Sequence, residues 1–230
     1  MIGIICAMAQ ELDKVLELMT NKSEEEFTSF NFVIGNLNNH KCVAVLSGIG
    51  KVNAAICTQT LIIKYQPDII LNIGVAGGID DNINIGDIVV AESVVQHDFD
   101  ISAFVNRKKG EIPGIDKIKI TCIPCIVQKI LTTSRNIKGV KIHKGIIASG
   151  DQFINCSNKL LQLKNEFDAV ACEMEAGSIG QVCYVNKVNF GVIRSISDNA
   201  NSDAKIDFYE FIENASKNAA RILYNFTQSI

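Results

Sequence analysis

Two carboxylates, Glu173 and Glu175, stand on either side of Met174 where an apolar run of the sequence ends. The run, 169–172, has the composition of a buried strand, and a helix-like segment follows over 176–185. A carboxylate that loses its hydration beside a core costs free energy unless a partner or a ligand compensates for it. Two acids at the end of such a strand therefore indicate a site for acid–base chemistry, although a solvated strand end with acids of no function would have the same sequence.

Glu11 and Asp198 also stand near the ends of predicted strands. Glu11 lies in the first helical turn after the strand 2–7, and Asp198 follows the strand 189–196. An acid at a helix N-terminus is favourable on electrostatic grounds, so Glu11 also has an ordinary structural explanation. Ligands of α/β sheets bind outside the carboxyl ends of the strands. We therefore expect Glu11, Asp198 and the pair of glutamates to lie around one pocket.

Separated carboxylates suit acid–base catalysis at a glycosidic carbon, because one acid can protonate the leaving group while another activates water. No Ser-His-Asp or Cys-His order is identifiable around them. Apolar, sulfur-containing and aromatic side chains are expected at the same edge of the sheet, and they suit the burial of a base ring with an apolar tail. These side chains are Met8, Ile49, Phe153 and Met174, with Phe208 nearby.

Two glycine-rich segments follow predicted strands and would let a ligand approach the backbone. The first, Ser47-Gly48-Ile49-Gly50-Lys51, is not a Walker A motif, because its first glycine is missing and Val52 replaces Ser or Thr. A dinucleotide fingerprint is also absent, since the next acid, Asp68, precedes a strand instead of ending one. The second segment, 74–78, contains three glycines, of which Gly77 is expected to lie against the ligand.

The elements that position these residues alternate between strand and helix along the whole chain. Strands are predicted over 2–7, 30–35, 41–47, 69–73, 88–95, 144–149, 168–172 and 189–196. Helices are predicted up to residue 19 after the first strand, and over 52–64, 125–134, 158–167, 176–185 and 208–227. An exposed charged loop is expected over 22–26, and a long polar loop over 96–114 with His97 in a structural role. The alternation predicts one α/β domain over residues 1–230, with a mixed, largely parallel central sheet and helices on both faces.

The composition argues against several classes of protein. The 230 residues are 47% hydrophobic with a formal net charge of −3, so the chain can bury a core and has no basic excess for nucleic acid. The N-terminal apolar run is expected to be a first strand rather than a signal peptide, and no run approaches the length of a membrane span. The eight cysteines lie mostly in apolar runs, so reduced thiols in the cytoplasm are expected. The isolated pair Cys122 and Cys125 has too few neighbouring ligands to predict a metal site.

Short segments along nearly the whole chain resemble those of one enzyme family. In order they are IGIICAMAQEL, SGIGKVNAA, PDIILNIGVAGG, IGDIVV, SGDQFI, CEMEA and RSISDNA, with HDFD and Pro113-Gly114 between them. Each segment is weak evidence alone, but together they resemble the 5′-methylthioadenosine/S-adenosylhomocysteine nucleosidases of the nucleoside phosphorylase superfamily. The resemblance implies a three-layer α/β/α sandwich and hydrolysis of the N-glycosidic bond of both nucleosides, which releases adenine and a thioribose in methionine salvage. It also implies that no cofactor or metal is needed.

The same resemblance implies roles for the acids. Asp198 would be the general acid that donates a proton toward N7 of adenine, and Glu11 would be the base that polarises the attacking water. Glu175 would hold the ribose hydroxyls and help to place that water. The role of Glu173 stays open between a paired supporting carboxylate and a direct contact. Asp198 must be protonated to act, which requires burial or a hydrogen bond that raises its pKa.

The resemblance also implies a set of residues around the substrate. They are Met174 at the sugar, Arg194 at the water, Ser197 beside Asp198, Phe153 and the backbone of Ile154 at adenine, and Met8, Ile49, Phe104 and Phe208 around the sugar and the alkylthio tail. Members of the family are homodimers, in which the loop that contains Pro113 reaches the neighbouring site. The sequence departs from the family at Val75, where serine is common, and at Asn199 and 201–205, which lie next to the pocket.

Three alternative functions differ from this hypothesis in what they require of the sequence. A phosphorylase needs a cationic phosphate site, but the segments 6–12 and 72–78 contain no arginine, and the carboxylate of Glu11 favours water over phosphate. A nucleosidase for 5′-deoxyadenosine or aminofutalosine is not separated from the main reading by the sequence. A nucleoside-binding sensor without catalysis is disfavoured, because pure binding needs no acid–base pair.

Overall fold

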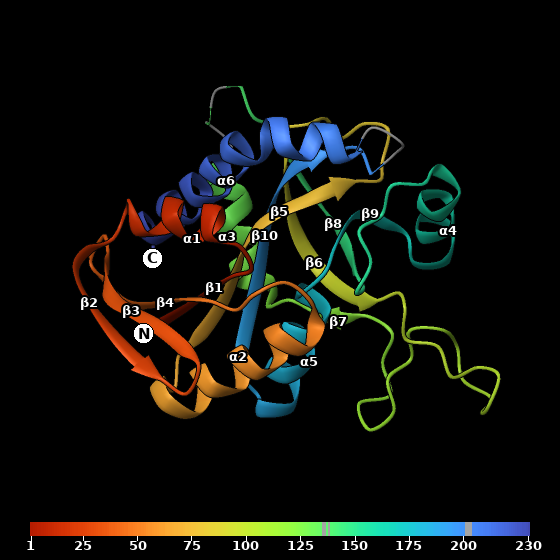
Figure 1. The fold of residues 1–230 in the computed structure, drawn as a ribbon, viewed down its shortest axis with the longest axis horizontal. Coiled ribbons are helices and arrows are strands. Elements are labelled where there is room, and N and C mark those ends of the chain that lie inside the picture. The colour runs from red at the N-terminus through yellow and green to blue at the C-terminus, as the bar shows by residue number, and fades with distance from the viewer. Residues whose placement is uncertain (135–136, 138, 201–203) are drawn as a thin grey trace.

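The computed structural model describes residues 1–134, 137, 139–200 and 204–230. Within these ranges, ten strands form one sheet and six helices pack around it (Figure 1). The strands are β1 (Ile2–Cys6), β2 (Thr20–Phe27), β3 (Phe30–Leu37), β4 (His40–Leu46), β5 (Ile69–Gly78), β6 (Ile88–Gln96), β7 (Ile120–Thr121), β8 (Ile142–Ser149), β9 (Ala169–Glu173) and β10 (Asn189–Asp198). The helices are α1 (Ala9–Leu16), α2 (Lys51–Tyr65), α3 (Pro124–Ser134), α4 (Ser157–Phe167), α5 (Ala176–Asn186) and α6 (Ala204–Gln228).

The centre of the sheet closes on itself. β5 pairs with β10, β10 with β6, β6 with β8 and β8 with β9, and β9 pairs again with β5. β1, β4, β3 and β2 extend from β5 as an open arm, in which β1 is parallel to both β4 and β5 while the hairpin strands are antiparallel. Closure brings three strand ends together, since Gly77 of β5 pairs with both Cys172 of β9 and Asp198 of β10.

Helices cover both faces of the sheet. α1, α3 and α6 lie on one face, and α2 and α5 pack together on the other (Figure 1). α6 shows why it takes this place, because Ala215, Ala219, Ile222 and Phe226 recur at helical spacing and are all buried. The three-layer α/β/α sandwich with a mixed sheet is therefore confirmed. None of the helices in the described ranges combines the length and the apolar character that a membrane span requires.

Several element boundaries differ from the sequence predictions. Residues 22–26 were expected to form a loop but belong to β2, an edge strand that is exposed along its whole length and pairs only with β3 among the described residues. β5 and β10 both continue farther than expected, through Gly78 and Asp198, and β7 was not predicted. α1 ends at Leu16 instead of residue 19, and α6 begins a turn earlier than expected, at Ala204. Of the divergent segment 201–205, residues 201–203 lie outside the described residues.

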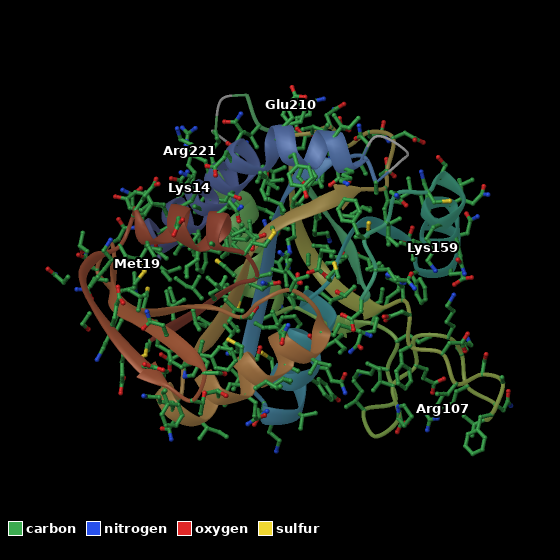
Figure 2. All side chains as sticks on the ribbon, viewed as in Figure 1. Lys14, Met19, Arg107, Lys159, Glu210 and Arg221 are labelled. Atoms are coloured by element: carbon green, nitrogen blue, oxygen red, sulfur yellow. The ribbon has the colours of Figure 1, made fainter. Side chains whose placement is uncertain are left out.

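One long connection leaves the compact body of the protein. It joins β6 to β7 and carries Arg107, which lies well away from the sheet and its helices (Figure 2). An antiparallel bridge between Ile112 and Lys117 and ion pairs from Arg107 to Glu111 and Asp116 organise it internally. The polar loop predicted over 96–114 is thus an ordered projection.

Candidate active site

Glu11 is held at the end of β1 by backbone donors. Its Oε2 accepts hydrogen bonds from the N–H groups of Ala7 at 2.8 Å and Met8 at 3.0 Å, and its Oε1 accepts one from Val75 at 2.9 Å. The side chain is buried, and burial raises the pKa of the carboxyl, while Arg194 and the three N–H groups partly offset this effect. Glu11 therefore presents a fixed carboxyl group whose affinity for a proton is higher than in water.

Glu175 stands at the start of α5 and faces the β4–α2 turn. Its Oε1 accepts a hydrogen bond from the N–H of Gly50 at 2.8 Å, and its Oε2 lies 3.6 Å from Nη2 of Arg194. Burial and the negative charge of Glu173 raise the pKa of Glu175 to about 7. The carboxyl therefore changes its charge near neutral pH.

Arg194 lies beneath these acids and is almost fully buried. Its Nη2 donates to Oδ1 of Asn72 at 2.6 Å and to Oε2 of Glu173, and its Nη1 lies 3.8 Å from Oε1 of Glu11. The side chains of Arg194 and Glu11 lie over position 74, which must be glycine because a Cβ there would collide with both of them. Arg194 is thus the shared counter-charge of the floor of the site and does not itself line the pocket.

Asp198 lies at the end of β10, across the strand pairing from Gly77. Its Oδ2 accepts a hydrogen bond from the hydroxyl of Ser197 at 2.8 Å, and its Oδ1 accepts one from the N–H of Ala200 at 2.8 Å. Burial raises the pKa of Asp198, and these two hydrogen bonds offset only part of that effect. The protonated form, which a general acid requires, is thereby favoured.

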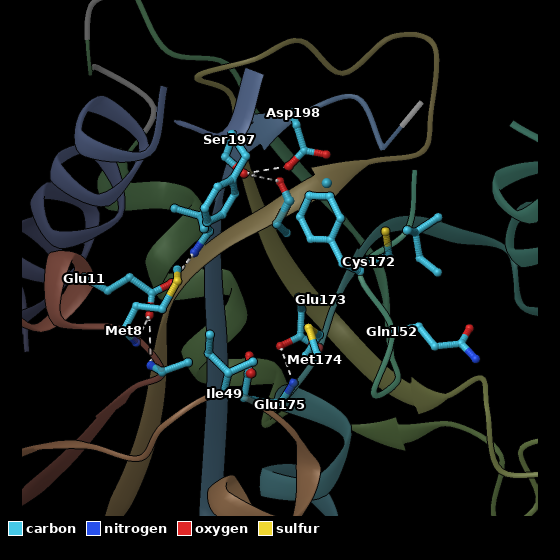
Figure 3. Close-up of a pocket in the computed structure, with 17 residues that line it drawn as sticks. Met8, Glu11, Ile49, Gln152, Cys172, Glu173, Met174, Glu175, Ser197 and Asp198 are labelled. Carbon is cyan, nitrogen blue, oxygen red and sulfur yellow. Dashed lines mark hydrogen bonds between the residues drawn. The ribbon is translucent and has the colours of Figure 1, made fainter. Parts of the chain in front are cut away.

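These groups surround one pocket. Figure 3 shows Asp198 and Ser197 at the top of it, Glu11 and Met8 at the left, and Ile49, Met174 and Glu175 at the bottom. Phe153 and Phe208 meet edge to face at 5.9 Å between ring centroids and form a further wall. The lining residues are Ala7, Met8, Glu11, Ile49, Val75, Ala76, Gly77, Gln152, Phe153, Ile154, Cys172, Glu173, Met174, Glu175, Ser197, Asp198 and Phe208.

Most residues expected around the substrate line this pocket. Arg194 lies beneath its floor, and Phe104 and Pro113 lie on the projecting loop. Phe104, expected at the sugar and tail, lies on the projecting loop with 88% of its surface exposed and does not line this pocket. Pro113 is on the same loop and is also exposed and outside the pocket, so neither residue reaches the site of its own chain. The sequence indicated no role for four lining residues, Ala7, Ala76, Gln152 and Cys172, although all four lie in or beside segments expected at this edge.

A network of charges fixes the loops at the mouth of the pocket. Lys51 donates from Nζ to Oδ1 of Asp98 at 2.6 Å, and its backbone N–H donates to Oδ1 of Asp151 at 2.7 Å. Asp98 also accepts the N–H of Asp151 at 2.9 Å. This network ties the glycine-rich turn that carries Ile49 to the loop that carries Phe153. His97 is buried against Gly150 and does not line the pocket, and burial lowers its pKa.

The glycine-rich turn before α2 is already occupied by protein groups. The N–H of Gly50 binds the carboxylate of Glu175, and the ammonium group of Lys51 binds Asp98. No arginine or lysine lines the pocket formed by the described residues, and no group of three His, Cys, Asp or Glu side chains among them is arranged to hold a metal ion. The site therefore suits acid–base chemistry on a neutral or cationic group and offers no cradle for phosphate.

The closed sheet, its helical layers and this pocket place the protein in the phosphorylase superfamily, whose family model matches residues 1–228. The chain is 39% identical over 230 residues to a 5′-methylthioadenosine/S-adenosylhomocysteine nucleosidase of Exiguobacterium sp., with 100% of this chain and 98% of that protein covered. It belongs to this nucleosidase family, as the sequence motifs predicted.

Two solved structures are similar over their whole length. A Neisseria meningitidis 5′-methylthioadenosine/S-adenosylhomocysteine nucleosidase in complex with methylthio-immucillin-A superimposes with a TM-score of 0.95 at 32% identity, with 100% of this chain and 99% of that chain covered. The futalosine hydrolase of Helicobacter pylori superimposes with a TM-score of 0.94 at 33% identity, with 100% and 97% covered. The fold is therefore shared by enzymes whose names give different nucleoside substrates.

Proposed function

We propose that this protein hydrolyses the N-glycosidic bond of 5′-methylthioadenosine and S-adenosylhomocysteine and releases adenine and the corresponding thioribose. The observation that carries the proposal is the placement of Asp198 at one end of an apolar pocket and of Glu11 and Glu175 on other sides of it. This arrangement separates a proton donor for the leaving base from the groups that bind sugar and water. Membership of the nucleosidase family supports the same reaction.

Asp198 is the proposed general acid. Protonation of adenine at N7 makes the base a better leaving group, and burial keeps a proton on Asp198 to a higher pH than in water. The hydroxyl of Ser197 orients the carboxyl group, and Phe153 and the backbone of Ile154 form the wall on which the base rests. Gly77 leaves this end of the pocket open to the base, because a Cβ there would lie 2.9 Å from Oδ1 of Asp198.

Glu11 and Glu175 are proposed to act on the sugar side. Glu11 accepts a proton from the attacking water, and Glu175 accepts hydrogen bonds from the ribose hydroxyls, with Met174 packed against the sugar. Bond cleavage leaves positive charge on the ribose ring. Three carboxyl groups, Glu11, Glu173 and Glu175, share the single guanidinium of Arg194, so the floor of the pocket is net negative when they are ionised and stabilises that charge.

The same electrostatics argue against phosphorolysis. A phosphate dianion beside Glu11 would meet three carboxyl groups that share one guanidinium, that of Arg194, which does not line the pocket. The ammonium group of Lys51 and the N–H of Gly50 are already bound to Asp98 and Glu175. Water is therefore the proposed nucleophile.

A second candidate substrate class has a specific observation in its favour. The futalosine hydrolase of Helicobacter pylori, with a TM-score of 0.94 at 33% identity, is about as similar to this chain as the Neisseria meningitidis nucleosidase, with 0.95 at 32% identity. In both cases the group attached at the ribose 5′ position would lie against Met8, Ile49 and Phe208. We therefore include 5′-deoxyadenosine and aminofutalosine as alternatives for the same hydrolytic reaction.

We also propose that the protein acts as a cytoplasmic homodimer. Three apolar side chains of α2, Val52, Ile56 and Ile63, are each more than half exposed, and so is Val185 of the neighbouring helix α5. An apolar patch of this kind is typical of a protein interface, and the projecting loop with Phe104 could then extend toward a partner. The free cysteines, of which most are buried, suit a reducing compartment. Light scattering at micromolar concentration tests the dimer.

Adenine release measures the proposed reaction directly. The kcat/KM for methylthioadenosine, adenosylhomocysteine, 5′-deoxyadenosine and aminofutalosine is compared with and without phosphate. We expect phosphate-independent release of adenine, with the two thioethers preferred. Formation of a ribose 1-phosphate would instead identify a phosphorylase, and binding without release of adenine would identify a sensor.

A further inference from the structure

Glu173 has more hydrogen-bond donors than the other acids of the site. Its Oε2 accepts the N–H groups of Glu175 at 3.0 Å and Ala176 at 2.8 Å and also binds Nη2 of Arg194, while its Oε1 accepts the hydroxyl of Ser149. The hydroxyl oxygen of Ser149 in turn accepts the N–H of Gly177 at 2.7 Å. Glu173 and Ser149 therefore satisfy the free N–H groups at the start of α5 and join β8, β9 and β10 at one point.

The orientation of Arg194 depends on this point. A guanidinium group is planar and rigid, so the two bonds of Nη2, to Glu173 and to Asn72, determine where Nη1 lies. In this orientation Nη1 faces Glu11 and Nη2 faces Glu175. Its Nε is buried without a hydrogen-bond partner, so no third bond within the described residues holds the group in place.

We infer that Glu173 is a positioning residue for the proposed reaction: it fixes the guanidinium group of Arg194 between Glu11 and Glu175. It does this while its own oxygens are occupied by protein donors, so it needs no direct bond to the substrate. The inference rests on the proposed function, because Glu175 is taken to accept hydrogen bonds from the ribose.

The charges around Glu175 determine the direction in which its pKa should change when Glu173 is replaced. In the described part of the chain, the charged groups that act on it are Glu173 from β9, Arg194 from β10 and Glu11 from α1. Glu173 and Glu11 raise the pKa of Glu175, and Arg194 lowers it. Glu173→Gln removes the larger of the two negative influences, so Glu175 should release its proton at a lower pH.

The test is the pH profile of kcat/KM for adenine release from methylthioadenosine. Ionised Glu175 is required in the proposed reaction, so activity should fall on the acid side of the profile as Glu175 is protonated. In Glu173→Gln we expect this acid limb to move to lower pH by about one unit or more. We also expect kcat at the optimum to fall by about 10- to 100-fold, because Arg194 loses a fixed partner.

Three variants separate positioning from a general structural role. Glu173→Asp keeps the charge and should leave the acid limb at the wild-type pH. Ser149→Ala keeps every charge and should also leave the limb in place, while kcat falls by about 3- to 10-fold. Glu92→Gln removes a half-exposed acid of β6 that pairs with Lys144 of β8 at 2.9 Å. This variant should change neither the acid limb nor kcat.

The outcomes are distinguishable from a failure of the proposed function. If wild-type protein releases no adenine, the proposed function is wrong. If wild-type protein releases adenine but the limb of Glu173→Gln stays in place or moves to higher pH, the inference about Glu173 is wrong. If Glu173→Gln does not fold, which circular dichroism would show, an unchanged kcat in Ser149→Ala overturns the positioning role.

Discussion

Replacement of Glu175 with glutamine is predicted to stabilise the protein above neutral pH, even though it removes a proposed ligand of the ribose. Burial and the charge of Glu173 raise the pKa of Glu175 from its ordinary value of 4.5 to about 7. The folded chain therefore keeps this proton over a pH range in which the unfolded chain has lost it. Because folding takes up a proton here, the free energy of unfolding contributed by Glu175 falls as the pH rises from about 4.5 to about 7.

The size of this effect follows from the pKa. Each pKa unit represents about 1.4 kcal/mol, so the ionised carboxyl destabilises the folded state by about 3 kcal/mol at pH 8. A neutral glutamine avoids this cost and can still accept the N–H of Gly50. For a chain of this size the corresponding rise in Tm is about 6–12 °C at pH 8. At pH 5 the side chain of the folded wild type is already neutral, and the two proteins should melt within about 3 °C of each other.

The assay is thermal and urea unfolding of both proteins at pH 5 and pH 8, at one protein concentration because association also shifts Tm. Glu92→Gln is the matched control, since Glu92 is a half-exposed acid in an ion pair with Lys144, and it should change the free energy of unfolding by less than about 1 kcal/mol at either pH. A stability difference for Glu175→Gln that is equal at both pH values, or a less stable variant at pH 8, would refute the reasoning.

Three further substitutions probe the proton donor, the floor and the mouth of the pocket. Asp198→Asn should lower adenine release by about 100- to 10,000-fold while a methylthioadenosine analogue still binds in calorimetry, and near-normal turnover would contradict the role of general acid. Gly74→Ala places a Cβ against Arg194 and Glu11, so it should lower the free energy of unfolding by about 1–3 kcal/mol and also lower kcat/KM. Unchanged values would show that these two side chains have room for a Cβ. Lys51→Met removes the ion pair between Nζ and Asp98 but keeps the backbone hydrogen bond to Asp151, so it loosens the contact between the loops that carry Ile49 and Phe153. Steady-state kinetics should then show KM raised by about 3- to 10-fold with a smaller change in kcat. A lower kcat at constant KM would instead indicate that Lys51 affects chemistry.

The sequence predicts the pocket well because its acids follow strands. Glu11, Glu175 and Asp198 each stand where a strong apolar run ends, and the carboxyl ends of neighbouring strands of an α/β sheet meet at one edge. The three acids are therefore brought together by topology alone. The same logic places Met8 and Ile49, which follow β1 and β4.

The sequence does not predict the place of a residue that lies outside any periodic pattern or that depends on partners far away in the chain. The strand β2 is exposed along its whole length, so it has no alternation of apolar and polar residues, and only pairing with β3 makes it a strand. Arg194 lies inside the apolar run of β10, and its three acidic neighbours come from other elements, so its position could not be read from local spacing. Phe104 lies on a projecting loop with 88% of its surface exposed, and its expected place at the sugar and tail came from the resemblance instead of from any pattern in the loop.

Glu173 and Glu175 carry the same carboxyl group two residues apart, but their surroundings differ. Glu173 ends β9, and its side chain turns to the N-terminus of α5, where N–H groups, Ser149 and Arg194 surround its carboxyl group. Glu175 is the residue before α5, with a non-helical backbone at φ −131° and ψ −41°, which turns its side chain away from those donors. It finds one N–H group, Gly50, and a guanidinium group already bound to Glu173. Hydrogen-bond donors stabilise the ionised form of a carboxyl group, and burial without donors does not. The pKa of Glu175 therefore rises to about 7, only two residues from Glu173, whose oxygens are occupied by protein donors.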